Sequence, residues 1–397
     1  MTRELRLRLA GIAAVIAATL AMPALAYDGL VEKKTFEMPS YVTVGGKTIK
    51  NVKIGWESYG TLNAAKDNVI LICHFFSGDS HAAGKYAAAD AAPGYWDSII
   101  GAGKPIDTDK FFVISSDTLV NLSTKNPKVV TTGPASINPD TGKPYGMTFP
   151  IVTIRDFVNV QKALLESLGI RKLHTVAGAS MGAIQAFEWA AAYPDMVERI
   201  VPVIGAAEAD AYTIGWLDFW GQPIKIDPNW NGGDYYGKAE PEAGLALALK
   251  IVTIHARAPG WADATFGRKQ ADPAKSVLDS WDGKFAIVDA LDKAGAARAK
   301  VADANSFLYL VRANQLHSAG MKGSLEEGLK SVKAKALVIP ASSDELLPPY
   351  LSERAAALLK KQGNAVELVT LEGNGGHLDG VLAVAKVGEQ IKKFLAQ

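Results

Sequence analysis

The chain has 397 residues, of which 48% are hydrophobic and 21% are charged, so it has the ordinary composition of a globular protein with a large core. Lys and Arg together number 42 against 41 Asp and Glu, and no charge excess indicates a nucleic-acid partner or an anionic membrane surface. The single cysteine, Cys73, excludes an intramolecular disulfide.

The first 26 residues are typical of a targeting segment. Three arginines in MTRELRLR precede LAGIAAVIAATLAMP, an apolar stretch that is short for a membrane span. The small residues of ALA then end at Ala26, as at a cleavage site. We therefore predict a signal peptide over residues 1–26 and a periplasmic or secreted mature protein that is free of the membrane. An uncleaved anchor or a buried first helix is the alternative.

Several segments after residue 40 have the hydrophobicity patterns of β-strands. Residues 41–60 alternate in hydrophobicity and break at Gly45-Gly46, which predicts an antiparallel hairpin at the edge of a sheet. Short, continuously apolar runs predict strands of a parallel sheet that is covered on both faces. These runs span residues 68–75, 110–117, 173–180, 199–207, 335–342 and 365–372. Cys73 lies within the first run, so we expect it to be a buried strand residue.

Helical periodicity lies between and after these runs, at residues 153–169, 181–193, 350–363 and 381–395. The alternation of strands and helices predicts an α/β fold with a mostly parallel, doubly wound sheet. Residues 208–333 contain no strand run and are rich in Trp, Tyr and Ala. We therefore predict a core of residues 27–207 and 334–397, with a helical lid inserted over residues 208–333.

A serine lies at one junction between a strand and a helix. Gly178-Ala-Ser180-Met-Gly182 follows an apolar strand and precedes a long helix, which is the setting of the G-x-S-x-G nucleophile elbow. So sharp a turn leaves no room for Cβ atoms at the two glycine positions. The N-terminus of the helix would stabilise an oxyanion beside Ser180, and we predict that Ser180 is a nucleophile.

A nucleophilic serine needs a histidine base. In this type of fold the chain order is Ser, then Asp or Glu, then His, and of the six histidines only His377, in EGNGGHLDG, follows the last strand. The glycine-rich loop would let its imidazole reach the elbow, so we predict that His377 is the base. The others are expected to be structural: His74, His81, His174, His255 and His317.

The histidine in turn needs an orienting acid. Asp344 and Glu345 lie just past the strand KALVIPAS, and Asp344 is our prediction. Capping of the helix that begins near Leu347 is an alternative role for Asp344, and it is compatible with the first. Asp379 is too close to His377 in sequence to orient the ring easily.

The oxyanion is expected to be held by two backbone N–H groups. Met181 directly follows the nucleophile, and Phe76 lies in the loop of residues 74–81 after an early strand. Core packing of the Phe75 and Phe76 rings is compatible with this role. The chemistry needs no metal and no cofactor.

Long motifs in the chain resemble homoserine O-acetyltransferases. They include TGPASINPDTGKPYGMTFPIVTIRDFV (132–158), GASMGAIQAFEWAAAYPDMV (178–197), DPNWNGGDYY (227–236) and SDELLPP (343–349). The stretches at 57–84 and 95–117 are also similar. The resemblance implies an α/β-hydrolase core, a helical lid and a triad of Ser180, Asp344 and His377. It also implies a ping-pong acyl-enzyme mechanism and a homodimer formed through the lid.

The chain departs from this family where the family holds homoserine. Members have an Asp directly after the catalytic histidine, and here this residue is Leu378. A lid arginine that pairs with the homoserine carboxylate corresponds to Leu249 in GLALALK, and an aromatic hydroxyl corresponds to Ala256. A buried zwitterion without polar partners would be strongly disfavoured, so we treat Leu249, Ala256 and Leu378 as candidate pocket residues.

Export would also separate the enzyme from cytoplasmic acetyl-CoA. Our leading hypothesis is therefore an exported serine hydrolase that cleaves small-molecule, short-chain esters. The alternative is an acyl-CoA-dependent O-acetyltransferase that acts on homoserine or another alcohol. A binding module that has kept the fold is a third reading, which the intact triad disfavours. The aromatic residues Trp216, Phe219 and Trp220 suit an apolar substrate group, or else lid packing or a dimer interface.

Overall fold

The computed structural model describes residues 29–397. The predicted signal peptide and its cleavage site after Ala26 lie outside the described residues. Among residues 29–397, no helix is both long enough and apolar enough to cross a membrane. An eight-stranded sheet forms the centre of the molecule, in the order β1-β2-β6-β3-β9-β10-β11-β12.

Strands β3 to β12 of this sheet run parallel, which confirms the predicted α/β class. All six continuously apolar runs form strands. Their bounds are β3 Val69–Cys73, β6 Phe112–Ser116, β9 Thr175–Ala179, β10 Arg199–Val203, β11 Lys335–Val338 and β12 Val366–Leu368. Two small two-stranded sheets lie outside it, formed by β4 Ile100–Gly101 with β5 Ile106–Asp107 and by β7 Ile137–Asn138 with β8 Lys143–Pro144.

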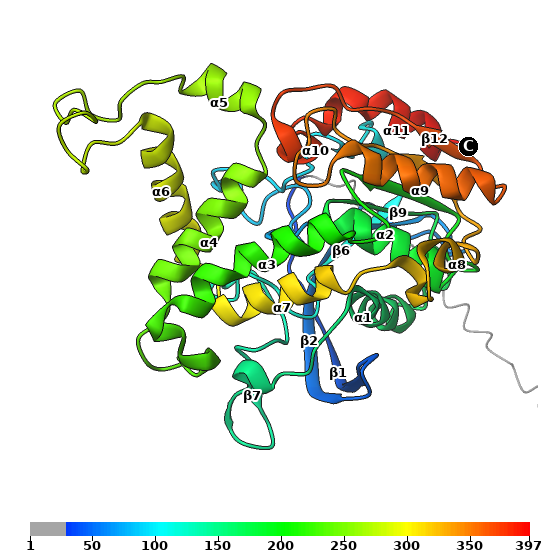
Figure 1. Cartoon of the computed structure of the whole chain (residues 1–397). Coiled ribbons are helices and arrows are strands. Elements are labelled where there is room, and N and C mark those ends of the chain that lie inside the picture. Colours follow the sequence, from blue (N-terminus) through cyan, green and yellow to red (C-terminus); the bar gives the residue numbers. More distant parts are fainter. Residues whose placement is uncertain (1–28) are drawn as a thin grey trace, which may run out of the picture.

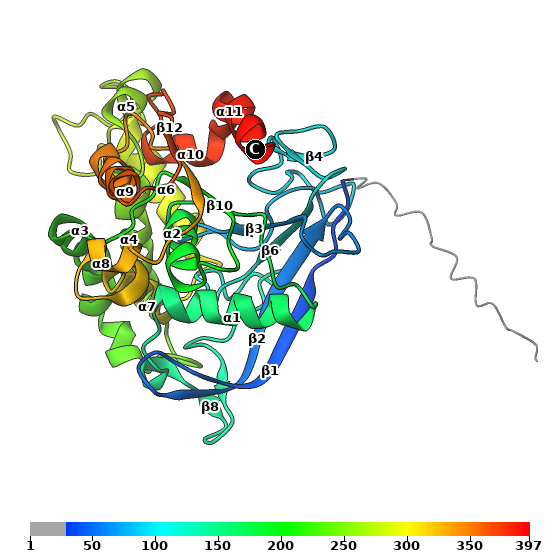
Figure 2. The same ribbon diagram turned by 90° about the vertical axis from the view of Figure 1, so that its right-hand side faces the viewer.

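The antiparallel hairpin at the sheet edge is confirmed but is longer than expected. It consists of β1 (Lys34–Val42) and β2 (Thr48–Tyr59), joined by a turn at Gly45-Gly46, and extends well beyond the parallel strands (Figure 2). The prediction began the hairpin at residue 41, and this boundary was wrong. No residue of β1 is fully buried, and the strand contains Pro39, so the sequence marks it only weakly as a strand.

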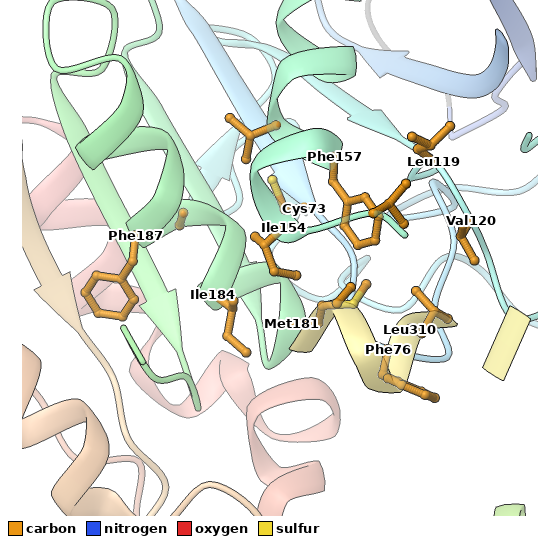
Figure 3. Packing of buried hydrophobic residues seen from close by; sticks show 14 of the residues in the cluster. Cys73, Phe76, Leu119, Val120, Ile154, Phe157, Met181, Ile184, Phe187 and Leu310 are labelled. Carbon is orange, nitrogen blue, oxygen red and sulfur yellow. The ribbon is translucent and has the colours of Figure 1, made fainter. Parts of the chain in front are cut away.

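Successive residues of the parallel strands pack on opposite faces of the sheet. Leu71 and Cys73 face a core that includes α1 (Ile154–Ser167), α2 (Met181–Ala192) and α9 (Pro349–Lys361), and Figure 3 shows part of it around Cys73. Ile70 and Ile72 face a second core, with α11 (Gly388–Leu395) and the segment around Trp96. The alternation has the two-residue period of a strand buried on both sides.

The chain leaves the sheet after β10 and returns at β11, and its elements between are helices (Figure 1). Helices α3, α4 and α6 extend beyond one end of the sheet, with α5 above them. The helix bounds are α3 Ala211–Ile226, α4 Glu242–His255, α5 Pro259–Thr265, α6 Ala286–Ala299, α7 Ala304–Gln315 and α8 Leu325–Leu329. This agrees in kind with the helical insertion expected over residues 208–333, whose exact boundaries stay a prediction.

The single helix predicted over residues 381–395 was wrong. The chain forms α10 (Asp379–Leu382), a 3₁₀ turn (Val384–Val387) and then α11. The break is at Ala383, which adopts φ −120° and ψ 9°, and a Cβ added to Gly388 would lie 2.8 Å from the Pro105 ring. Close packing on residue 105, which is distant in sequence, therefore shapes this segment.

Candidate active site

The turn between β9 and α2 places Ser180 at the edge of the sheet. Ser180 adopts φ 57° and ψ −119°, a strained conformation for a residue with a side chain. A Cβ on Gly178 would lie 2.6 Å from the carbonyl oxygen of Cys73, and one on Gly182 would lie 2.0 Å from it. Only glycine fits at these two positions, as the elbow motif predicts.

The three predicted side chains form a buried chain of hydrogen bonds. His377 Nε2 lies 2.7 Å from Ser180 Oγ, and His377 Nδ1 lies 2.6 Å from Asp344 Oδ2. All three residues are at most 9% exposed. Because Asp344 accepts from Nδ1, the ring presents a free Nε2 to the serine hydroxyl, which is the tautomer that a general base needs.

Asp344 has both of the roles that the sequence left open. Its Oδ1 accepts the backbone amides of Leu346 and Leu347, at 2.9 and 3.0 Å, while Oδ2 faces His377. Glu345 is exposed. Asp379 accepts the amide of Gly375 at 2.9 Å and so shapes the loop that carries His377.

The predicted oxyanion donors are the backbone amides of Met181 and Phe76, and both residues line one cavity together with Ser180. Met181 is the first residue of α2, and Phe76 lies in the loop after β3. Within residues 29–397, neither amide donates to a protein acceptor. The Phe75 carbonyl is held by His74 Nδ1 at 2.8 Å and by the amide of Gly78 at 2.9 Å.

These contacts orient the Phe75–Phe76 peptide. In a planar trans peptide the N–H points opposite to the C=O, so fixing the Phe75 carbonyl also fixes the direction of the Phe76 N–H. His74 Nε2 accepts the Thr118 amide at 3.2 Å, and burial lowers the pKa of His74. From the sequence we expect His74 only to be structural, and no motif indicates that it holds the Phe75 carbonyl.

A buried charged cluster supports the same loop. The Ser80 amide donates to Asp117 Oδ1 at 2.8 Å, and Lys33 pairs with Glu57 at 2.9 Å and hydrogen-bonds Ser80. Burial raises the pKa of Asp117 to about 6. Burial also acts to raise the pKa of Glu57, but hydrogen bonds from His81 and Tyr86 and the charge of Lys33 outweigh it and lower that pKa.

Ser180 opens onto two cavities of unequal size. The smaller has a volume of about 40 Å³ and is lined by Met181, Leu217 and other apolar side chains. The larger has a volume of about 370 Å³ and is lined by His377, among others. Phe76 and Trp220 line both cavities. Metal ligands are not gathered in clusters of three or more anywhere in residues 29–397.

His255 helps to fix the wall between the cavities. Its Nδ1 accepts the indole N–H of Trp220 at 3.1 Å, and its ring lies 4.1 Å from that of Trp216. Burial, with a contribution from the charge of His377, lowers the pKa of His255 to about 4. It is therefore neutral near pH 7 and can accept this hydrogen bond.

Two of the three predicted pocket residues line a cavity. Ala256 and Leu378 line the larger cavity, but Leu249 is buried in the core and lines neither cavity, so its assignment was wrong. Trp216 and Trp220 line the smaller cavity, whereas Phe219 is 51% exposed on the outer surface of α3. The homodimer through the lid stays a prediction.

The larger cavity also contains a cation that was not predicted from the sequence. Arg298, near the end of α6, lines it together with Ser180 and His377. Its Nη1 donates to Thr253 Oγ1 at 2.8 Å and to the Leu249 carbonyl at 3.3 Å. No motif marked Arg298, because its position depends on how α6 packs on α4.

Comparison with known proteins identifies the family. The model for the α/β hydrolase fold matches residues 68–382. A homoserine O-acetyltransferase from Methanohalobium evestigatum is 40% identical over 369 residues, which cover 93% of this chain and 74% of that protein.

Two solved structures are similar over most of their length. Esterase E22 is 57% identical, with a TM-score of 0.89 and coverage of 92% of this chain and 100% of that chain. A homoserine O-acetyltransferase from Bacillus anthracis is 39% identical, with a TM-score of 0.87, and the match covers 93% of this chain and 98% of that chain. This protein therefore belongs to the homoserine O-acetyltransferase-like family of α/β-hydrolase-fold enzymes.

Proposed function

We propose that this enzyme hydrolyses carboxylic esters of short acyl groups through an acyl-Ser180 intermediate. The observation that carries the proposal is the relay from Ser180 Oγ through His377 to Asp344, with distances of 2.7 and 2.6 Å. Ser180 Oγ attacks the ester carbonyl while His377 Nε2 takes its proton. The Phe76 and Met181 amides hold the oxyanion. His377 then protonates the departing alcohol, and water releases the acid by the same steps.

The position of His377 supports an assignment of the two substrate groups to the two cavities. The leaving alcohol must receive its proton from His377 Nε2, so it occupies the larger cavity, which His377 lines. The acyl group then occupies the smaller cavity, between Met181 and Leu217. A volume of about 40 Å³ supports an acetyl or a similarly small acyl group.

Acetyl transfer to homoserine is the second candidate. The curated relatives are named homoserine O-acetyltransferases, and as a set the comparisons favour transfer over an exported esterase. We place hydrolysis first because acceptor choice depends on a few cavity residues. Leu378 and Ala256 line the larger cavity, and no carboxylate of residues 29–397 lines it to pair with an ammonium group. The 57% identity to an esterase supports the same choice.

Parallel assays separate the two candidates. We expect turnover of a neutral acetyl ester, with hydrolysis dominating over transfer, and no acetylation of homoserine at millimolar concentration. The physical reason is that an unpaired, buried ammonium costs several kcal/mol. The assays follow acetate release from short esters and, separately, release of CoA from acetyl-CoA with homoserine.

Saturable, acetyl-CoA-dependent acetylation of homoserine with a kcat above ~1 s⁻¹, as in ordinary enzymes, would refute hydrolysis as the main function. The second candidate would then take its place. A Leu378→Asp variant is a useful comparison, because it adds a carboxylate to the cavity. We expect this variant to gain transfer relative to hydrolysis.

We further propose that the enzyme is exported, on the strength of residues 1–26 alone. The Arg-rich start, the apolar stretch and the small residues before Tyr27 support this proposal. N-terminal sequencing of protein from the native envelope is expected to begin at Tyr27. An intact Met1 in a cytoplasmic fraction would contradict export and strengthen the transferase candidate.

A further inference from the structure

Arg298 is a cation in the wall of a mostly apolar cavity, whose other polar side chains are Ser77, Ser180, Thr253 and His377. Its neighbours in the cavity wall include Val252, Ala294, Ala297 and Leu378. Arg298 forms no ion pair with any carboxylate of residues 29–397. Burial lowers the pKa of this guanidinium, and no neighbouring acid offsets the effect. A guanidinium in this setting is stabilised when an anion binds beside it.

Close helix packing sets the position of this side chain. A Cβ added to Gly295 would lie 2.4 Å from the Ala246 carbonyl oxygen, so α6 presses directly against α4 at this point. Arg298 lies three residues further on, on the same side of α6, and reaches across to Thr253 and Leu249. The Thr253 hydroxyl accepts from Arg298 and itself donates to the Leu249 carbonyl at 2.7 Å.

The remaining donors of the guanidinium are free. Only Nη1 has protein acceptors, while Nε and Nη2 have none within residues 29–397. These two nitrogens form the edge of the guanidinium that binds a carboxylate in a bidentate manner. Arg298 is therefore anchored on one side and available to a ligand on the other.

From this arrangement we propose that Arg298 binds an anionic group, a carboxylate in the first instance, on the alcohol part of the substrate. The inference rests on the proposed function, which places the leaving alcohol in the larger cavity. Because this cavity offers a cation but no carboxylate, the preferred substrate is an acyl ester of a hydroxy acid without a neighbouring ammonium. The ester bond lies at Ser180, and the carboxylate lies at Arg298.

Two matched esters test the proposal. 4-Acetoxybutanoate carries a carboxylate, and 4-acetoxybutanamide is its neutral analogue of similar shape. We expect the wild-type kcat/KM to be at least tenfold higher for the carboxylate. Arg298→Gln should abolish this preference, so that the ratio of the two kcat/KM values falls to about one, and Arg298→Lys should keep part of it. Arg268→Gln, which removes an exposed lid arginine, is the control and should keep all of it.

Equal wild-type turnover of the two esters would overturn the proposal, and so would a preference that survives in Arg298→Gln. If Arg298→Gln does not fold, the wild-type ratio decides, together with a series from acetoxyacetate to 5-acetoxypentanoate, in which one chain length should be preferred. A series without a preferred length would also count against a fixed anion site.

Binding of alcohols that contain no ester bond tests the role of Arg298 independently of the proposed hydrolysis. Calorimetry with 4-hydroxybutanoate and 4-hydroxybutanamide should show at least tenfold tighter binding of the acid to the wild type, and no such difference for Arg298→Gln. Absence of hydrolysis with intact acid binding would overturn only the hydrolase assignment. Equal binding of the acid and the amide would overturn only the role of Arg298.

Discussion

Replacing Ser180 with alanine is expected to lower kcat for a short acetyl ester by on the order of 10⁴-fold or more, without unfolding the protein. The change removes the only hydroxyl within hydrogen-bond distance of His377 Nε2 in the described residues. No acyl-enzyme can then form, and the oxyanion amides alone give a small residual rate. Steady-state kinetics and a thermal melt measure the two effects.

Ser280→Ala serves as the control, because Ser280 is exposed in the loop before α6. It should match the wild type in both kcat and melting temperature. An organophosphonate probe should label the wild type and the control but not Ser180→Ala. Activity of Ser180→Ala within tenfold of the wild type would show that another group is the nucleophile.

The second large effect is expected at Asp344. Asp344→Asn should lower kcat by a similar factor, roughly 10⁴-fold, although the substitution is nearly isosteric. The asparagine can keep an oxygen for the Leu346 and Leu347 amides, so the turn should survive. Its NH₂ group would then face His377 Nδ1 and favour the tautomer that carries a proton on Nε2. That ring cannot accept the proton of Ser180.

Glu345→Gln is the matched control for this prediction, since Glu345 is adjacent and exposed. It should retain near-normal kcat. The reverse result, an active Asp344→Asn with an inactive Glu345→Gln, would show that the acid was misassigned by one residue. Melting curves of both variants exclude unfolding as the cause.

The features that could be predicted from the sequence are those encoded by local pattern. Strands such as Val69–Cys73 are buried on both faces, so they form short, continuous apolar runs, and their length and the turns beside them distinguish them from helices. The elbow at Ser180 is specified by two glycines, both of which have backbone atoms against them. His377 and Asp344 followed from chain order, because the topology fixes where each strand ends.

The features that could not be predicted depend on how each helix is rotated about its axis relative to the helices packed against it. Helix α4 carries apolar residues on several faces, so its sequence does not distinguish Leu249, which lines neither cavity, from Val252, which lines the larger one. Ala256, directly after the helix, also lines the larger cavity. The placement of Arg298 depends on the contact between Gly295 and Ala246, two residues of different helices. No pattern within a single helix contains that information.

The strained backbone of Ser180 has a consequence for how this protein can evolve. A residue with a side chain at φ 57° costs of order 1–3 kcal/mol, a sizeable part of a total stability of roughly 5–15 kcal/mol. The conformation persists only because β3, β9 and α2 leave the turn no room to relax. Substitutions at Gly178 and Gly182 are therefore poorly tolerated, although neither glycine takes part in the reaction. They are constrained because they hold the turn that carries Ser180. Adaptation to new substrates is expected to proceed through the cavity walls on the lid, where side chains can change without disturbing the turn.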